Sequence, residues 1–138
     1  MIAIAPTAIS LIELFKRRGI ASHHVLFWGP HSNKPVEEFG LELSPDEQAA
    51  ISMTASESCG QCWLTTKRFV WLDEGEWHQI LLNHIADVGP RVLRNQSALG
   101  LALELEDLDK NIYDIRMPET GVLNGFIAVL HRIARRAR

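Results

Sequence analysis

Alternation of apolar and polar residues is strongest in the second half of the chain, where it predicts strands. Leucine occupies every second position from 99 to 105, and side chains on a strand point alternately to two faces. Residues 107–111 then predict a turn and residues 112–117 a returning strand. Pro118 ends that strand, because proline cannot donate a hydrogen bond to a neighbouring strand. The pattern predicts an antiparallel pair with a row of leucines facing a core.

Three short apolar runs earlier in the chain predict a meander of antiparallel strands. The runs at 62–64 and 69–72 are joined by a polar step, and a third run at 77–82 follows an acidic turn that contains glycine. Trp, Phe, Val, Leu and Thr favour a pleated, half-buried surface, and a polar break between such runs is typical of a hairpin. Residues 44–47 resemble a helix start, but the alternation that follows favours a single turn and then a strand over about 48–56.

Apolar residues at helical spacing predict a helix near each end of the chain. Residues 7–18 carry one apolar stripe, with Thr7 or Ser10 as the N-cap and Gly19 as the residue after the last turn. Residues 120–138 carry a second stripe. Cations end both helices, where they complement the helix dipole, so we interpret them as solvated helix ends. These cations are Lys16, Arg17 and Arg18 in the first helix and His131, Arg132, Arg135, Arg136 and Arg138 in the second.

The meander also carries a more specific pattern of residues. It reads Gly60-x-x-x-Leu64-Thr65-x-x-Arg68-Phe69-x-Trp71, followed by Ile80-x-Leu82-x-x-Ile85-x-x-Val88. This pattern resembles that of bacterial pleckstrin-homology-like (PH-like) domains and the related GRAM domains, although His84 stands where that family often has an acidic residue. The resemblance implies mainly β structure: a bent antiparallel barrel closed at one end by a C-terminal amphipathic helix. We expect an N-terminal helical or irregular extension at 1–40 and a PH-like barrel domain at 41–138.

Composition and charge are those of an ordinary globular domain. The 138 residues are 46% apolar and 22% charged, which suits one domain with a single core. The net charge of −3 gives no overall basic footprint for nucleic acid, and no apolar run approaches the ~20 residues of a membrane span. The N-terminus lacks the positive charge of a signal peptide, so we expect a cytoplasmic protein. The loop at 56–60 is acidic and has no cation, so neither phosphoinositide binding nor membrane contact is expected.

Residues that could carry chemistry are few. Cys59 and Cys62 form a C-x-x-C pair, which can cycle between dithiol and disulfide or supply half of a zinc site. The pair leads into a strand rather than a helix, and no second ligand pair completes a zinc site, so Cys59 and Cys62 are weak metal candidates. The sequence has no nucleotide-binding or hydrolase motif. We expect no enzyme activity, no catalytic residues, no bound metal and no cofactor.

Both faces of the predicted meander are apolar, which indicates that something covers the second face. If Leu64, Val70 and Ile80 point inward, strand alternation turns a set of large apolar residues outward. Either the N-terminal helix or another subunit could cover that set, and exposed aromatic patches mark interaction surfaces. The partner-surface candidates are Phe69, Trp71, Trp77 and Leu81.

These features together predict a non-enzymatic binding or assembly module that recognises a protein partner or itself, with a homo-oligomer as the expected state. Two alternatives stay open. One is a barrel that holds a small apolar ligand in a cavity. The other is a thiol-dependent redox or zinc protein that uses Cys59 and Cys62.

Overall fold

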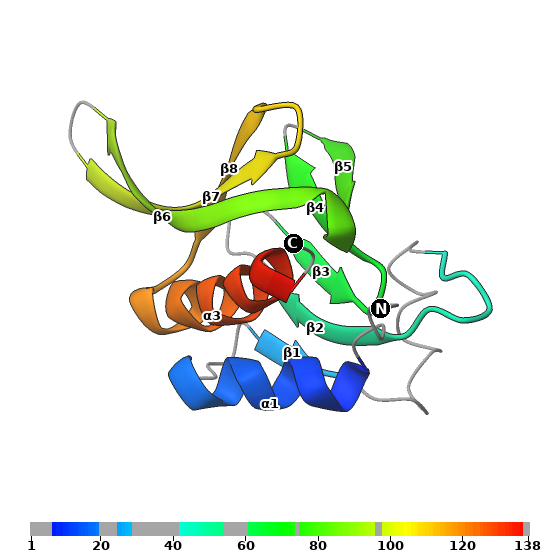
Figure 1. The fold of residues 1–138 in the computed structure, drawn as a ribbon. Coiled ribbons are helices and arrows are strands. Elements are labelled where there is room, and N and C mark those ends of the chain that lie inside the picture. The colour runs from blue at the N-terminus through cyan, green and yellow to red at the C-terminus, as the bar shows by residue number, and fades with distance from the viewer. Residues whose placement is uncertain are drawn as a thin grey trace.

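In the part of the chain that the computed structural model describes, two antiparallel sheets pack with two helices (Figure 1). That part comprises residues 7–19, 25–28, 42–53, 61–73, 75–95 and 98–136, and for residues 92–95 and 98–100 only the backbone is described. The elements are, in chain order, α1 (Ala8–Arg18), β1 (Val25–Phe27), β2 (Ala49–Met53), β3 (Cys62–Thr65), β4 (Arg68–Asp73), β5 (Glu76–Leu81), the 3-10 turn η1 (Leu82–His84), β6 (Ile85–Asn95), β7 (Ala98–Asp107), β8 (Ile112–Met117) and α3 (Thr120–Arg136).

The strands follow one another in meander order within two separate sheets. The first sheet has the order β1-β2-β3-β4-β5 and the second the order β6-β7-β8. The predicted strands are confirmed, with the strand predicted over about 48–56 seen at Ala49–Met53 and residues 54–56 outside the described part; a single turn, not a helix, precedes β2. Among the described strands no pair joins the two sheets, so the closed barrel of the prediction is absent there. The chain passes from the first sheet to the second at η1, and β5 and β6 on either side of this 3-10 turn belong to different sheets.

The β3–β4 hairpin orients its side chains differently from the prediction. Leu64 lies opposite Phe69, and Trp63 lies opposite Val70. Opposite residues point to the same face of a sheet, so Phe69 and Trp71 share the inward face with Leu64. The link between these strands has two residues, 66 and 67. Even-numbered positions on β3, such as Leu64, therefore pair with odd-numbered positions on β4, such as Phe69. The predicted grouping of Val70 with the inward set was therefore wrong.

One core connects both sheets and both helices. Phe126 of α3 contacts the rings of Phe15 in α1 and Phe69 in β4, with centroid distances of 5.2 and 5.8 Å. Leu103 and Leu105, from the predicted leucine row, are fully buried in the same cluster. The C-terminal helix is confirmed, and its apolar stripe faces this core. The buried residues of that helix are Val122, Leu123, Gly125, Phe126, Val129, Leu130 and Ala134.

The opposite face of the first sheet is covered within the chain over β2, β3 and β4, but not by the N-terminal helix. Trp28 stacks on Trp63 at a centroid distance of 5.5 Å, and Leu43 also packs there. Leu11 and Phe15 of α1 belong to the main core instead. The suggestion that α1 covers the second face is therefore wrong. The small cluster on that face consists of Ala49, Trp63 and Val70.

The described parts of the predicted N-terminal extension share the core of the rest of the chain. β1 pairs with β2, and α1 packs against α3. The boundary between residues 1–40 and 41–138 stays a prediction. Neither described helix combines the length and the apolar character that a membrane crossing requires.

Candidate functional site

Two glycines let α1 and α3 approach each other closely. α1 begins at a capping box in which Thr7 Oγ1 accepts from the Ser10 N–H and Ser10 Oγ accepts from the Thr7 N–H, both at 3.1 Å. It ends at Gly19, whose φ of −101° is extended and not left-handed. A Cβ on Gly19 would lie 2.6 Å from Gly125 Cα, and a Cβ on Gly125 would lie 2.5 Å from Phe15 Cζ. The close contact between the two backbones, not a left-handed cap, requires these glycines.

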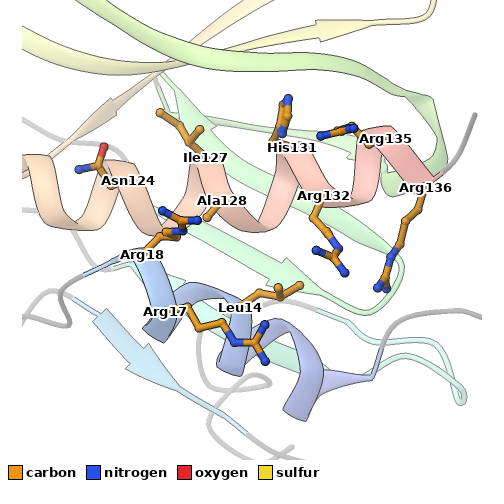
Figure 2. A pocket seen from close by; sticks show the side chains of 10 residues that line it. All are labelled: Leu14, Arg17, Arg18, Asn124, Ile127, Ala128, His131, Arg132, Arg135 and Arg136. Atoms are coloured by element: carbon orange, nitrogen blue, oxygen red, sulfur yellow. The ribbon is translucent and has the colours of Figure 1, made fainter.

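A groove of about 990 Å³ lies along the line where the two helices meet (Figure 2). Five arginines, one histidine and one asparagine give it a strongly basic lining, and three apolar side chains complete it. No carboxylate of the described residues lines this groove. We call it the basic groove. Its lining consists of Leu14, Arg17 and Arg18 from α1 and Asn124, Ile127, Ala128, His131, Arg132, Arg135 and Arg136 from α3.

The basic side chains divide into two groups by direction. Figure 2 shows Arg18, Arg132 and Arg136 in the space between the helices, and Arg17 lying across α1. His131 and Arg135 point to the other side of α3, toward β6. They also line a second groove there, of about 340 Å³, which two carboxylates share. The first group has no such partner in its groove among the described residues. The two carboxylates of the second groove are Asp87 and Glu106.

The basic groove concentrates positive charge on a chain that is otherwise acidic. The net charge is −3 and would be −8 without the five arginines of the groove. All ion pairs found in the described part belong to Lys67, Arg68 or Arg91, so none involves a groove arginine. Like charges that converge in this way repel one another and attract anions.

Guanidinium groups and an apolar lining together favour a particular class of ligand. Arginine stays charged and can give two parallel hydrogen bonds to one carboxylate or phosphate. The lining residues of α3 extend from Asn124 to Arg136, which is about 18 Å at 1.5 Å per residue. Leu14 and Ile127 are half-buried and also line this groove. The groove can therefore bind an elongated anion that also carries an apolar group.

The structure separates the four predicted partner-surface residues. Phe69 and Trp71 are buried, and the Trp71 ring packs against Tyr113 across the core at a centroid distance of 5.4 Å. Trp77 and Leu81 are 46% and 45% exposed. Only these two of the four are available to a partner, and neither lines the basic groove.

The cysteine pair receives no support as a reactive site from its described member. Cys62 is fully buried in β3. Burial raises the pKa of its thiol far above the ordinary range, against a smaller opposing effect of a backbone hydrogen bond at Met53. Cys59 and the loop at 56–60 lie outside the described residues. Within the described part, no group of three or more His, Cys, Asp or Glu side chains could hold a metal.

Arg68, the arginine of the PH-like pattern, is part of a structural clamp. Its Nε donates to Glu47 Oε2 at 2.9 Å, and Thr65 Oγ1 donates to the same oxygen. Glu47 is buried, and this tends to raise its pKa, but the hydrogen bonds from Arg68 and Thr65 lower that pKa below its ordinary value. Arg68 Nη1 also donates to Gln79 Oε1 at 2.6 Å. The clamp joins the turn before β2 to β3, β4 and β5.

Sequence reasoning missed the basic groove because it treated each basic run separately. The two runs lie near opposite ends of the chain, and each alone is typical of a helix C-terminus. The sequence signal that could have placed the two basic runs side by side is a pair of glycines, Gly19 and Gly125. One lies beside the apolar stripe of each helix, where a residue without a side chain allows two helices to approach closely. Comparisons of the chain with protein-family models, with curated proteins and with solved structures found no match.

Proposed function

We propose that this chain is a non-enzymatic binding module that docks an acidic segment of a partner protein in the basic groove. The observation that carries the proposal is that five arginines from two helices line a groove that no described carboxylate lines. Mutual repulsion of these arginines opposes folding, and a bound polyanion would relieve it. Anion binding is the function that this arrangement favours.

A protein segment fits the groove better than nucleic acid or a membrane. Without the five groove arginines the chain has a net charge of −8, so the rest of it on balance repels an extended nucleic acid. A membrane surface favours apolar side chains that can enter it, and none of the large exposed apolar residues of the described part lines the groove. An acidic segment with one apolar side chain can use both the arginines and Leu14 or Ile127.

The order of the elements supports a PH-like architecture for this module. A meander of antiparallel strands turns at η1 into β6, β7 and β8, and a C-terminal helix follows. That helix packs against β6 and η1, as the closing helix of the family's barrel would. Residues of the PH-like pattern also occupy the core: Leu64, Phe69 and Ile85 are fully or almost fully buried.

The test is a titration with a labelled glutamate-rich peptide that has one central leucine, followed by fluorescence anisotropy at low salt. We expect saturable binding that weakens as salt rises. Arg132→Gln with Arg136→Gln should raise Kd about tenfold, because each exposed ion pair contributes roughly 0.5–1 kcal/mol. The matched control is Arg116→Gln with Lys110→Gln, which removes the same charge from exposed positions on β8 and in the turn before it.

Two further probes identify the class of partner. A single-stranded thymidine oligonucleotide and vesicles with phosphatidylserine are titrated under the same conditions. Weaker binding of both than of the peptide supports the proposal. Tighter binding of the oligonucleotide or the vesicles overturns the choice of a protein partner. No peptide binding, or equal weakening by the control pair, overturns the groove itself as the site.

A further inference from the structure

β5 is an edge strand whose outer side is free among the described strands. It lies at the end of the first sheet, and of the described strands only β4 pairs with it. The Leu82 N–H donates to the Lys67 carbonyl oxygen at 3.0 Å, which fixes the alternation of hydrogen bonds along the two strands. The amides of Glu76, His78 and Ile80 therefore face β4. Those of Trp77, Gln79 and Leu81 face away from it.

This edge lacks the devices that protect the other sheet edges. Edge strands are commonly shortened, interrupted by proline or marked with charge, which prevents pairing with another chain. β1 has three residues, β6 contains Pro90, and β8 carries Asp114 and Arg116. In β5 no charge, proline or glycine occurs after its first residue. Instead, its two exposed apolar residues, Trp77 and Leu81, lie on one face.

We infer that β5 pairs antiparallel with β5 of a second copy of this chain, about a two-fold axis at Gln79. In this register Gln79 exchanges backbone N–H to C=O hydrogen bonds with Gln79 of the second copy. Trp77 does the same with Leu81 of the second copy, so each strand supplies hydrogen-bond partners for the outward backbone groups of the other. The Trp77 side chain then lies beside the second Leu81 on the same face, and both exposed apolar groups become covered.

Charge along β5 agrees with this orientation. The strand begins at an acidic turn, where Asp73 lies opposite Glu76. It ends beside Lys67, which lies across from Leu82 and pairs with Asp46 at 2.9 Å. Antiparallel pairing places the acidic turn of each copy against this charge-compensated end of the other and keeps the two acidic turns apart. A parallel arrangement would bring the two acidic turns together, and like charges would oppose it.

The first test is sedimentation velocity of the full chain over a range of concentrations. We expect the mass to double as concentration rises, and Trp77→Glu to weaken dimerisation by about tenfold or more. The matched control is Leu108→Glu, which places the same charge at an apolar residue that is 57% exposed outside β5. A chain that stays monomeric at every concentration overturns the inference. Equal weakening by Leu108→Glu also overturns it.

Two variants mixed together test which residues meet. In the proposed register the new carboxylate of a Trp77→Glu copy faces the new ammonium group of a Leu81→Lys copy, while the other contact keeps its native residues. The mixture should therefore form heterodimers more tightly than either variant forms homodimers. Failure of the mixture to restore association overturns the register.

Disulfide formation locates the axis independently. Under oxidation Gln79→Cys should cross-link, because the two Cα atoms on the axis would be about 5.5 Å apart. Leu81→Cys should not cross-link, because its counterpart lies about four residues along the strand, roughly 13 Å away. The opposite result overturns the axis at Gln79. Arg132→Gln should leave dimerisation unchanged, since the basic groove takes no part in it.

Discussion

The contact between α1 and α3 yields the sharpest prediction, because one methyl group tests it. Gly125→Ala would place a Cβ 2.5 Å from Cζ and 2.6 Å from Cδ2 of the Phe15 ring. Carbon atoms in a packed core prefer separations of ~3.5–4.0 Å, so the ring would have to move by about 1 Å. Phe15 is fully buried between Phe27 and Phe126, at centroid distances of 5.6 and 5.2 Å, and has no room to do so.

Two effects of opposite sign determine the result. Alanine is more favourable than glycine inside a helix by ~1 kcal/mol. Overpacking of a filled core costs ~1–3 kcal/mol, and contacts of 2.5 and 2.6 Å with a fully buried ring place this site in the upper half of that range. We expect Gly125→Ala to lower the free energy of unfolding by about 1–2 kcal/mol. For a chain of this length, that is a fall in Tm of roughly 3–8 °C.

Thermal and urea unfolding followed by circular dichroism measure this effect. Asn124→Ala is the control, because it changes an exposed neighbour on the same helix and should leave Tm unchanged or slightly raised. In a Phe15→Leu background the cost of Gly125→Ala should shrink by about 1 kcal/mol, since the clashing ring is gone. A Gly125→Ala variant that melts at or above the native Tm would refute the idea that close contact sets the spacing of the helices.

Three further predictions follow from buried or converging charges. Leu103→Asp should unfold the chain, because it places an unpaired carboxylate at a fully buried position, and a cooperative native-like melt would contradict this. Glu47 has a lowered pKa in the folded state, so its stabilising effect should be complete at neutral pH and disappear as pH falls through that lowered value. Glu47→Gln should therefore unfold at lower urea than the native chain at pH 7 and show a smaller difference in acid. Arg132→Gln should raise the free energy of unfolding by roughly 0.2–0.5 kcal/mol at low salt and by less in concentrated salt. The substitution removes a charge that repels the other groove arginines, and Arg132 precedes the last turn of α3, so it is not one of the cations at the helix end.

Local patterns were sufficient to predict most of the elements. Period-two leucines gave β7, the polar step gave the β3–β4 hairpin, and helical spacing gave α1 and α3. These signals succeed because each depends on neighbours within one element. For example, the alternation of the leucine row predicts that these side chains face the core, and Leu103 and Leu105 are fully buried.

Relations between elements were harder to predict, and the facing of the hairpin shows why. Whether Phe69 points inward depends on the length of the link before β4, since adding or removing one residue reverses every side chain after it. The apolar pattern alone does not reveal that length, because both faces of the first sheet carry large apolar residues. The prediction therefore placed Phe69 and Trp71 at the surface, whereas the structure buries both.

The basic groove shows the same limit in electrostatic form. A helix C-terminus carries a partial negative charge, which explains Arg136 at the end of α3 as long as that helix is considered alone. The helices run antiparallel, however, and Figure 2 shows Arg136 extending toward the N-terminal part of α1, where the partial charge is positive. Arg17 and Arg18 likewise end α1 beside the first half of α3. The dipole of the neighbouring helix therefore cancels part of the stabilisation that each group of arginines gains from its own helix. A bound anion would stabilise positive charge that the fold itself does not compensate. For this reason the proposed function is assigned to the groove and not to the exposed Trp77.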